Sequence, residues 1–80
     1  MDDPSLHQHI EDLVAEEERL LHAHEADGLS DAEHARLEAV RVELDRYWDL
    51  LRQRRARREA GLNPDDASLR DAGTVEGYEQ

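Results

Sequence analysis

The stretch that decides the fold is Asp-Gly-Leu-Ser-Asp-Ala-Glu at residues 27–33, which separates two segments with apolar residues at helical spacing. Gly28 suits the left-handed conformation that commonly ends a helix. Ser30 and Glu33 form a capping-box pattern, in which each side chain accepts a hydrogen bond from the other residue's backbone N–H at a helix start. The stretch therefore predicts that one helix ends and a second begins within a few residues.

The apolar residues on either side of this turn predict two helices that pack together, at about residues 4–27 and 30–60. Folding at residues 28–29 pairs positions whose numbers sum to about 57. Each pair is then apolar on both sides: Leu20 with Leu37, Leu13 with Leu44, Ile10 with Tyr47, and Leu6 with Leu51. We therefore expect an all-α, coiled-coil-like antiparallel hairpin over residues 4–61. Its first helix begins opposite Arg52, so the second helix should project beyond it by about 12 Å.

Residues 62–80 form an acidic tail that we expect to be partly ordered. Asn63-Pro64-Asp65-Asp66 is typical of a helix start and predicts a short helix at about residues 64–72. A further hypothesis is that the tail folds over the basic end of the second helix as a switch, through its acidic residues Asp65, Asp66, Asp71, Glu76 and Glu79.

Composition narrows the classes of function. The chain has 80 residues, a formal net charge of −11 and no cysteine, which limits it to one domain without disulfides or thiolate chemistry. The acidic charge opposes general binding to nucleic acid or to anionic membranes. No apolar run is long enough to cross a membrane, and no signal-like segment opens the chain, so we expect a cytoplasmic protein without membrane association.

A basic cluster interrupts this acidic chain near the end of the second helix. It contains five arginines and no acid: Arg52, Arg54, Arg55, Arg57 and Arg58. Guanidinium groups bind carboxylate and phosphate equally well, and cations are also favoured at a helix C-terminus by the macrodipole. We expect the cluster to bind an acidic protein partner. The alternative is a nucleic-acid-associated regulator that docks the cluster on phosphate, which the surrounding acidic charge makes less favourable.

The apolar stripe is wider than a single hairpin requires. A hairpin of this size buries little surface, and extra width on an apolar stripe indicates a further helical surface packed against it. The sequence therefore predicts a homodimer that forms a four-helix bundle. The residues expected to mediate this self-association are Val14, Leu21, Tyr47 and Trp48.

Histidines and a seam carboxylate are the remaining candidates for chemistry. The helical i,i+4 pairs His7–Glu11 and Glu18–His22 supply two ligands each, whereas a structural zinc site needs four. Glu17 occupies a seam position and is expected either to turn outward to solvent or to pair with Arg36 or Arg41 of the facing helix. Without a second catalytic group we expect no enzyme activity, metal or cofactor.

The residues from Trp48 to Gly61, Trp-Asp-Leu-Leu-Arg-Gln-Arg-Arg-Ala-Arg-Arg-Glu-Ala-Gly, resemble a family of small actinobacterial proteins catalogued as a domain of unknown function. The opening residues 1–3, the turn at 63–66 and residues 75–78 are similar as well. The resemblance implies a bacterial, cytoplasmic protein and carries over no functional residue. Function therefore rests on the reasoning above, which favours a non-enzymatic protein-interaction module.

Overall fold

Helix α1 spans Asp3–Asp27 in the computed structural model, which describes residues 2–73. Its N-cap is Asp2, whose carboxylate accepts a hydrogen bond from the backbone N–H of Ser5 at 2.9 Å. The helix therefore begins at Asp3, one residue before the predicted start at residue 4. At the other end, the N–H of Gly28 bonds to the carbonyl of His24, and Gly28 has a φ of 77°, which favours glycine.

Helix α2 spans Asp31–Glu59 and begins with the predicted capping box. The backbone N–H of Ser30 donates to Glu33 Oε1 at 3.0 Å, and the N–H of Glu33 donates to Ser30 Oγ at 3.1 Å. The bond from the backbone N–H of Ser30 lowers the pKa of the Glu33 side chain, because it favours the ionised carboxylate. The helix ends before Gly61, which has a φ of 76°, so both predicted helices are confirmed to within a residue at each end.

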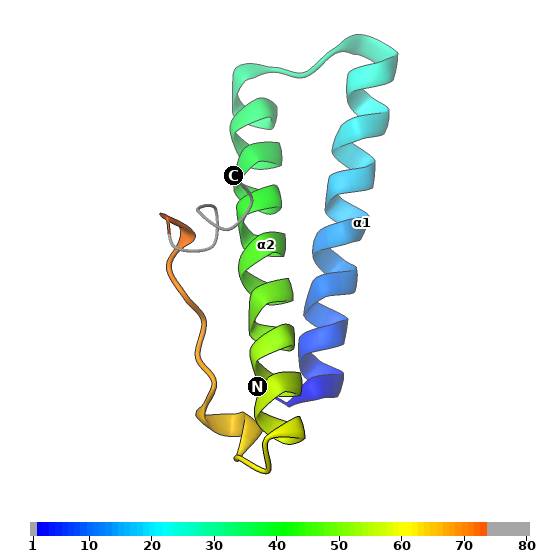
Figure 1. The fold of residues 1–80 in the computed structure, drawn as a ribbon. Coiled ribbons are helices and arrows are strands. Elements are labelled where there is room, and N and C mark those ends of the chain that lie inside the picture. The colour runs from blue at the N-terminus through cyan, green and yellow to red at the C-terminus, as the bar shows by residue number, and fades with distance from the viewer. Residues whose placement is uncertain (1, 74–80) are drawn as a thin grey trace.

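The two helices lie antiparallel and pack along the predicted seam (Figure 1). Contacts between them follow the predicted register: Asp3 reaches Arg54, His9 stacks on Tyr47, and Glu17 reaches Arg41. The buried apolar seam residues are Leu6, Ile10, Leu13, Leu37, Val40, Leu44 and Leu51. The hairpin is therefore confirmed.

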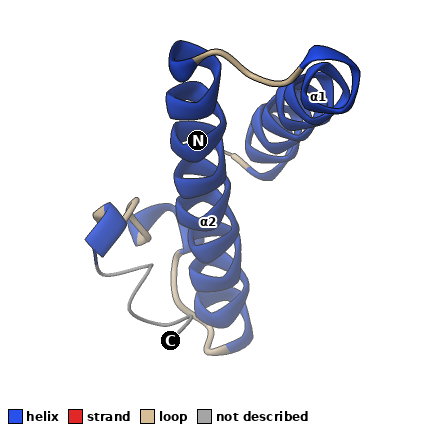
Figure 2. Cartoon of the chain, turned by 90° about the horizontal axis from the view of Figure 1, so that it is seen from above, coloured by secondary structure: helices blue, strands red, loops and turns tan. Residues whose placement is uncertain are grey.

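The outer side of α2, away from α1, is covered by the residues that follow the helix (Figures 1 and 2). One turn of 3-10 helix, η1, spans Pro64–Asp66, and the chain then returns alongside α2. We call residues 63–73 the strap. Ala67 and Leu69 of the strap pack against the core that contains Leu50. Leu50 is buried although it lies off the seam, because the strap supplies a second apolar surface on α2.

The predicted helix at residues 64–72 is wrong. Side chains of α2 donate hydrogen bonds to strap carbonyls, which in a helix would accept hydrogen bonds from the strap's own backbone N–H groups. The backbone becomes extended at Ala67. Gln53 then donates to the carbonyl of Ser68 at 2.9 Å, and Arg46 donates to the carbonyl of Arg70 at 2.8 Å. Glu76 and Glu79, and the family-like residues 75–78, lie outside the described residues.

Replacing a buried and an exposed leucine by alanine tests the packing of the core. Leu6 is completely buried, whereas Leu62 is 56% exposed. We expect Leu6→Ala to lower the free energy of unfolding by about 2–5 kcal/mol, because it removes buried methylene groups and leaves a cavity. The matched control Leu62→Ala should change it by no more than about 0.5 kcal/mol. Urea denaturation followed by circular dichroism measures both, and equal losses would contradict the described core.

Candidate interaction site

Arg54 lies inside the fold, although the sequence placed it in an exposed basic cluster. Its side chain is 6% exposed and bonds to two other segments of the chain. Its Nε donates to Asp3 Oδ1 at 2.6 Å, and its Nη1 donates to the carbonyl of Pro64 at 3.2 Å and to Asp65 Oδ1 at 3.0 Å. Arg54 therefore connects the start of α1 to the start of the strap, and its charge is not available to a partner.

The second helix does project beyond the first, but by less than the predicted 12 Å: α1 begins at Asp3, level with Arg54, and α2 ends five residues later at Glu59, about 7.5 Å further on. Asp3, at the start of α1, pairs with both Arg54 and Arg58, so α1 reaches beyond Arg52 toward the last turns of α2. The hydrogen bond from Arg54 holds the pKa of Asp3 below its usual range, and the nearby charge of Arg58 adds to this effect. The basic end of α2 is thus partly neutralised by the chain itself.

Three arginines of the cluster remain outside these pairs. Arg52 and Arg55 are exposed, and Arg57 is half-buried beside Leu62; none forms an ion pair within residues 2–73. The structure divides the cluster: Arg54 and Arg58 bind Asp3, Arg52 and Arg55 are exposed, and Arg57 is half-buried. Within residues 62–73, the tail supplies the carboxylate of Asp65 to the cluster and then runs along α2.

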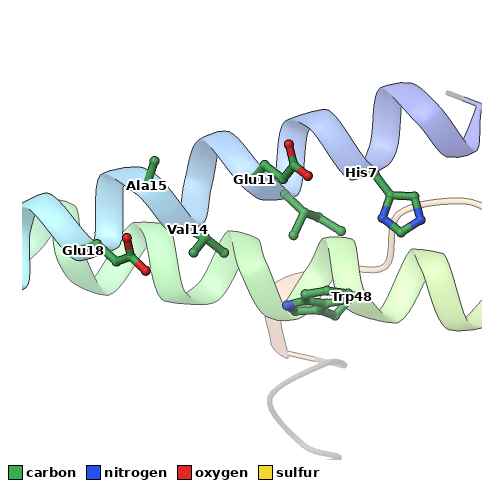
Figure 3. Close-up of a pocket in the computed structure, with 7 residues that line it drawn as sticks. His7, Glu11, Val14, Ala15, Glu18 and Trp48 are labelled. Atoms are coloured by element: carbon green, nitrogen blue, oxygen red, sulfur yellow. The ribbon is translucent and has the colours of Figure 1, made fainter.

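Trp48 borders an open groove between the two helices (Figure 3). Its side chain is 41% exposed, and the groove encloses about 340 Å³. Ile10 and Val14 of α1 supply apolar lining, and the charged or polar residues around them also come from α1: His7, Glu11 and Glu18. Trp48 lies off the seam because it follows Tyr47 by one residue, a rotation of about 100° around the helix.

A second hollow, of about 230 Å³, lies nearer the turn and is lined by three leucines and four polar or charged residues: Leu21, Leu29, Leu37, His24, His34, Glu38 and Arg41. It belongs to the same face as the Trp48 groove, since Leu21 follows Val14 by seven residues, or about two helical turns. An ion pair between Arg41 and Glu17, at 3.3 Å, crosses between the helices on this face. We call this surface the open face and define its apolar residues as Ile10, Val14, Leu21, Leu37 and Trp48.

Tyr47 does not belong to the open face. Its ring lies 4.3 Å from that of His9, with the two planes tilted by 55°, and it packs against the core. His9 borders a different hollow from the one beside Trp48. The structure therefore brings together three of the four residues proposed for self-association, Val14, Leu21 and Trp48, and places Tyr47 on the other side of the seam.

Other polar residues have structural partners or no ligand geometry. Glu17 pairs with Arg41, one of the two partners predicted for it, and Glu16 binds Arg36 through two hydrogen bonds of 2.5 and 2.6 Å. The hydrogen bond from Arg36 lowers the pKa of Glu16. Within residues 2–73, no three histidine, aspartate or glutamate side chains are grouped to hold a metal ion. Neither described helix has an apolar stretch of the length that a bilayer requires.

The division of the arginine cluster predicts unequal effects of two neighbouring substitutions. Arg54→Ala removes a buried side chain that binds Asp3, Pro64 and Asp65, so we expect the melting temperature to fall by about 5 °C or more. Arg55→Ala, the matched control on the exposed side, should leave it nearly unchanged. Thermal unfolding by circular dichroism gives both values, and equal shifts would show that Arg54 has no special structural role.

The acid-range pH dependence follows from the same pairs. The pKa values of Asp3 and Glu16 are lowered from 3.8 and 4.5, so the unfolded chain binds protons more readily than the folded one. Their contribution to stability is complete above about pH 5 and is lost as pH falls through the lowered pKa values. We expect the free energy of unfolding to decline below pH 4.5, and less steeply in Asp3→Asn. Denaturation between pH 2.5 and 6 measures this, and identical slopes would contradict the pairing of Asp3.

Comparisons with known proteins agree with the family suggested by the residues from Trp48 to Gly61. An uncharacterized protein of Mycobacterium tuberculosis is 49% identical to this chain over 71 residues, which cover 88% of this chain and 82% of that relative. An uncharacterized protein of Mycobacterium bovis matches with the same identity and coverage. No solved structure matches the chain. A family described as "Protein of unknown function (DUF2630)" matches residues 2–80, and the chain therefore belongs to this family.

Proposed function

We propose that this protein is a non-enzymatic interaction module that binds another protein through its open face. The observation that carries the proposal is the exposure of Trp48 beside an apolar groove formed by both helices. Large exposed apolar surfaces bordered by polar groups are typical of interaction sites, and tryptophan is enriched among residues that dominate binding energy. A groove between two helices suits the apolar face of a further helix.

Two exposed arginines of the basic cluster, Arg52 and Arg55, also support a binding role for the open face. Arg52 and Arg55 follow Trp48 by four and seven residues, so they lie on its side of α2. A partner that covers Trp48 would therefore meet these two cations as well, which favours acidic groups at that position. In this proposal two arginines of the basic cluster, Arg52 and Arg55, form one surface with Trp48 rather than a separate site.

The nucleic-acid alternative has weaker support. Arg54 and Arg58 are engaged by Asp3, and the groove beside Trp48 carries Glu11 and Glu18, which would repel phosphate. Arg52, Arg55 and Arg57 are the cations of the cluster that such a role would use. It predicts binding to DNA or RNA that weakens steeply with salt and is lost when these three arginines are replaced by alanine.

Site-specific crosslinking in cells tests the proposed function. A photoreactive phenylalanine analogue replaces Trp48 in one variant and Ala39 in a control, because Ala39 is exposed on the opposite side of α2. We expect protein adducts from position 48 and few from position 39. Equal yields at both positions would contradict the proposal, and adducts removed by nuclease would favour the nucleic-acid alternative.

A further inference from the structure

The charges on the open face are arranged in two opposite stripes. Along α1 the exposed acids Glu11, Glu18 and Glu25 recur every seven residues, so they follow one edge of the face. The α2 edge carries Arg41, Arg52 and Arg55 together with the acids Glu38 and Asp45, so its excess of basic groups is one charge. One edge of the open face is therefore acidic and the other weakly basic, most clearly at Arg52 and Arg55, with apolar residues between them.

We infer that the partner of the open face is the same face of a second copy of this chain; this inference rests on the proposed function. A two-fold interface uses one surface twice, so that surface has to be complementary to itself. With the two-fold axis parallel to the helices, α1 of each copy covers α2 of the other, and the acidic edge meets the basic edge. With the axis across the helices, α1 covers α1 and acid meets acid. The charge pattern therefore selects the parallel axis.

This symmetry also sets the register, because a pure rotation about an axis parallel to the helices allows no sliding along them. Two residues at the same height along the helix axes of one hairpin, such as Asp3 and Arg54, are therefore also at the same height when one belongs to each copy. Glu11 then lies nearly level with the partner's Asp45 and about six residues, or about 9 Å, from the level of the partner's Arg52. Helical side chains lean toward the N-terminus of their helix, so in these antiparallel helices the two side chains converge. Neither Glu11 nor Arg52 has an ion pair within the described part of the chain.

The size of the face suits such a dimer. α1 has 25 residues and is about 37 Å long, and two adjacent helices of about 10 Å diameter give a face on the order of 800 Å². Stable protein interfaces bury about this area on each partner. The product is a four-helix bundle in which every neighbouring pair of helices is antiparallel, with Val14, Leu21 and Trp48 in its interior.

Sedimentation equilibrium of the full chain tests the dimer. We expect a mass twice the 9.2 kDa of one chain, and Trp48→Ala should weaken association at least about tenfold while retaining the helical circular dichroism signal. Tyr47→Phe is the control, because Tyr47 packs on the other side of the seam and should leave the dimer unchanged. A wild-type protein that stays monomeric at several hundred micromolar would overturn the inference.

Charge exchange tests the arrangement of the two copies. Glu11→Arg and Arg52→Glu should each weaken the homodimer, since each change places like charges opposite one another. Mixed in equal amounts, the two variants should form a heterodimer as stable as the wild type, because both contacts are then between opposite charges. A wild-type dimer with no recovery in the mixture would overturn the parallel axis.

These results separate the inference from the proposed function. If the protein is monomeric and position 48 crosslinks to a different protein, the second copy is wrong and the interaction module is upheld. If position 48 crosslinks to another copy of the chain, both are supported. If the protein is monomeric and position 48 forms no more adducts than position 39, both are wrong.

Discussion

The apolar seam between α1 and α2 is the constraint on which the other features depend. The turn between the helices is short, so the register of the seam determines which side chains of α1 lie level with which of α2. Leu6 and Val40, both fully buried, lie toward opposite ends of this contact. The same register places Asp3 beside Arg54 and brings Ile10 beneath the groove that Trp48 borders. The ionic contacts and the open face are both consequences of the seam.

Arg54 then closes the end of the hairpin at which three segments of the chain meet. A buried guanidinium is costly unless its donors are satisfied, and here carboxylates and a carbonyl from α1 and the strap satisfy them. The strap continues along the outer side of α2 and buries Leu50. This explains how a two-helix chain acquires a third layer without a third full helix.

The placement of the strap has a consequence for function. It covers the side of α2 away from α1, and Tyr47 and His9 cover one side of the seam, while the side that carries Trp48 remains open. The open face combines apolar residues with separated acidic and basic edges, which is the pattern expected of a surface that binds a further helical pair. This face is the part of the described chain on which the proposed function rests.

The sequence by itself determined the two helices and their antiparallel register. Gly28, Ser30 and Glu33 mark the end of one helix and the start of the next, and the helical spacing of the apolar residues on either side sets which positions face each other. Tertiary structure alone decided the roles of residues whose partners are distant along the chain. Arg54 and Arg55 are neighbours of the same chemical type, yet one is buried and the other exposed, because only Arg54 faces Asp3 and Asp65. Likewise Tyr47 and Trp48 are adjacent aromatics on opposite sides of the seam. The strap backbone is extended because Gln53 and Arg46 bind its carbonyls, and these bonds exist only once residues far apart in sequence have packed together.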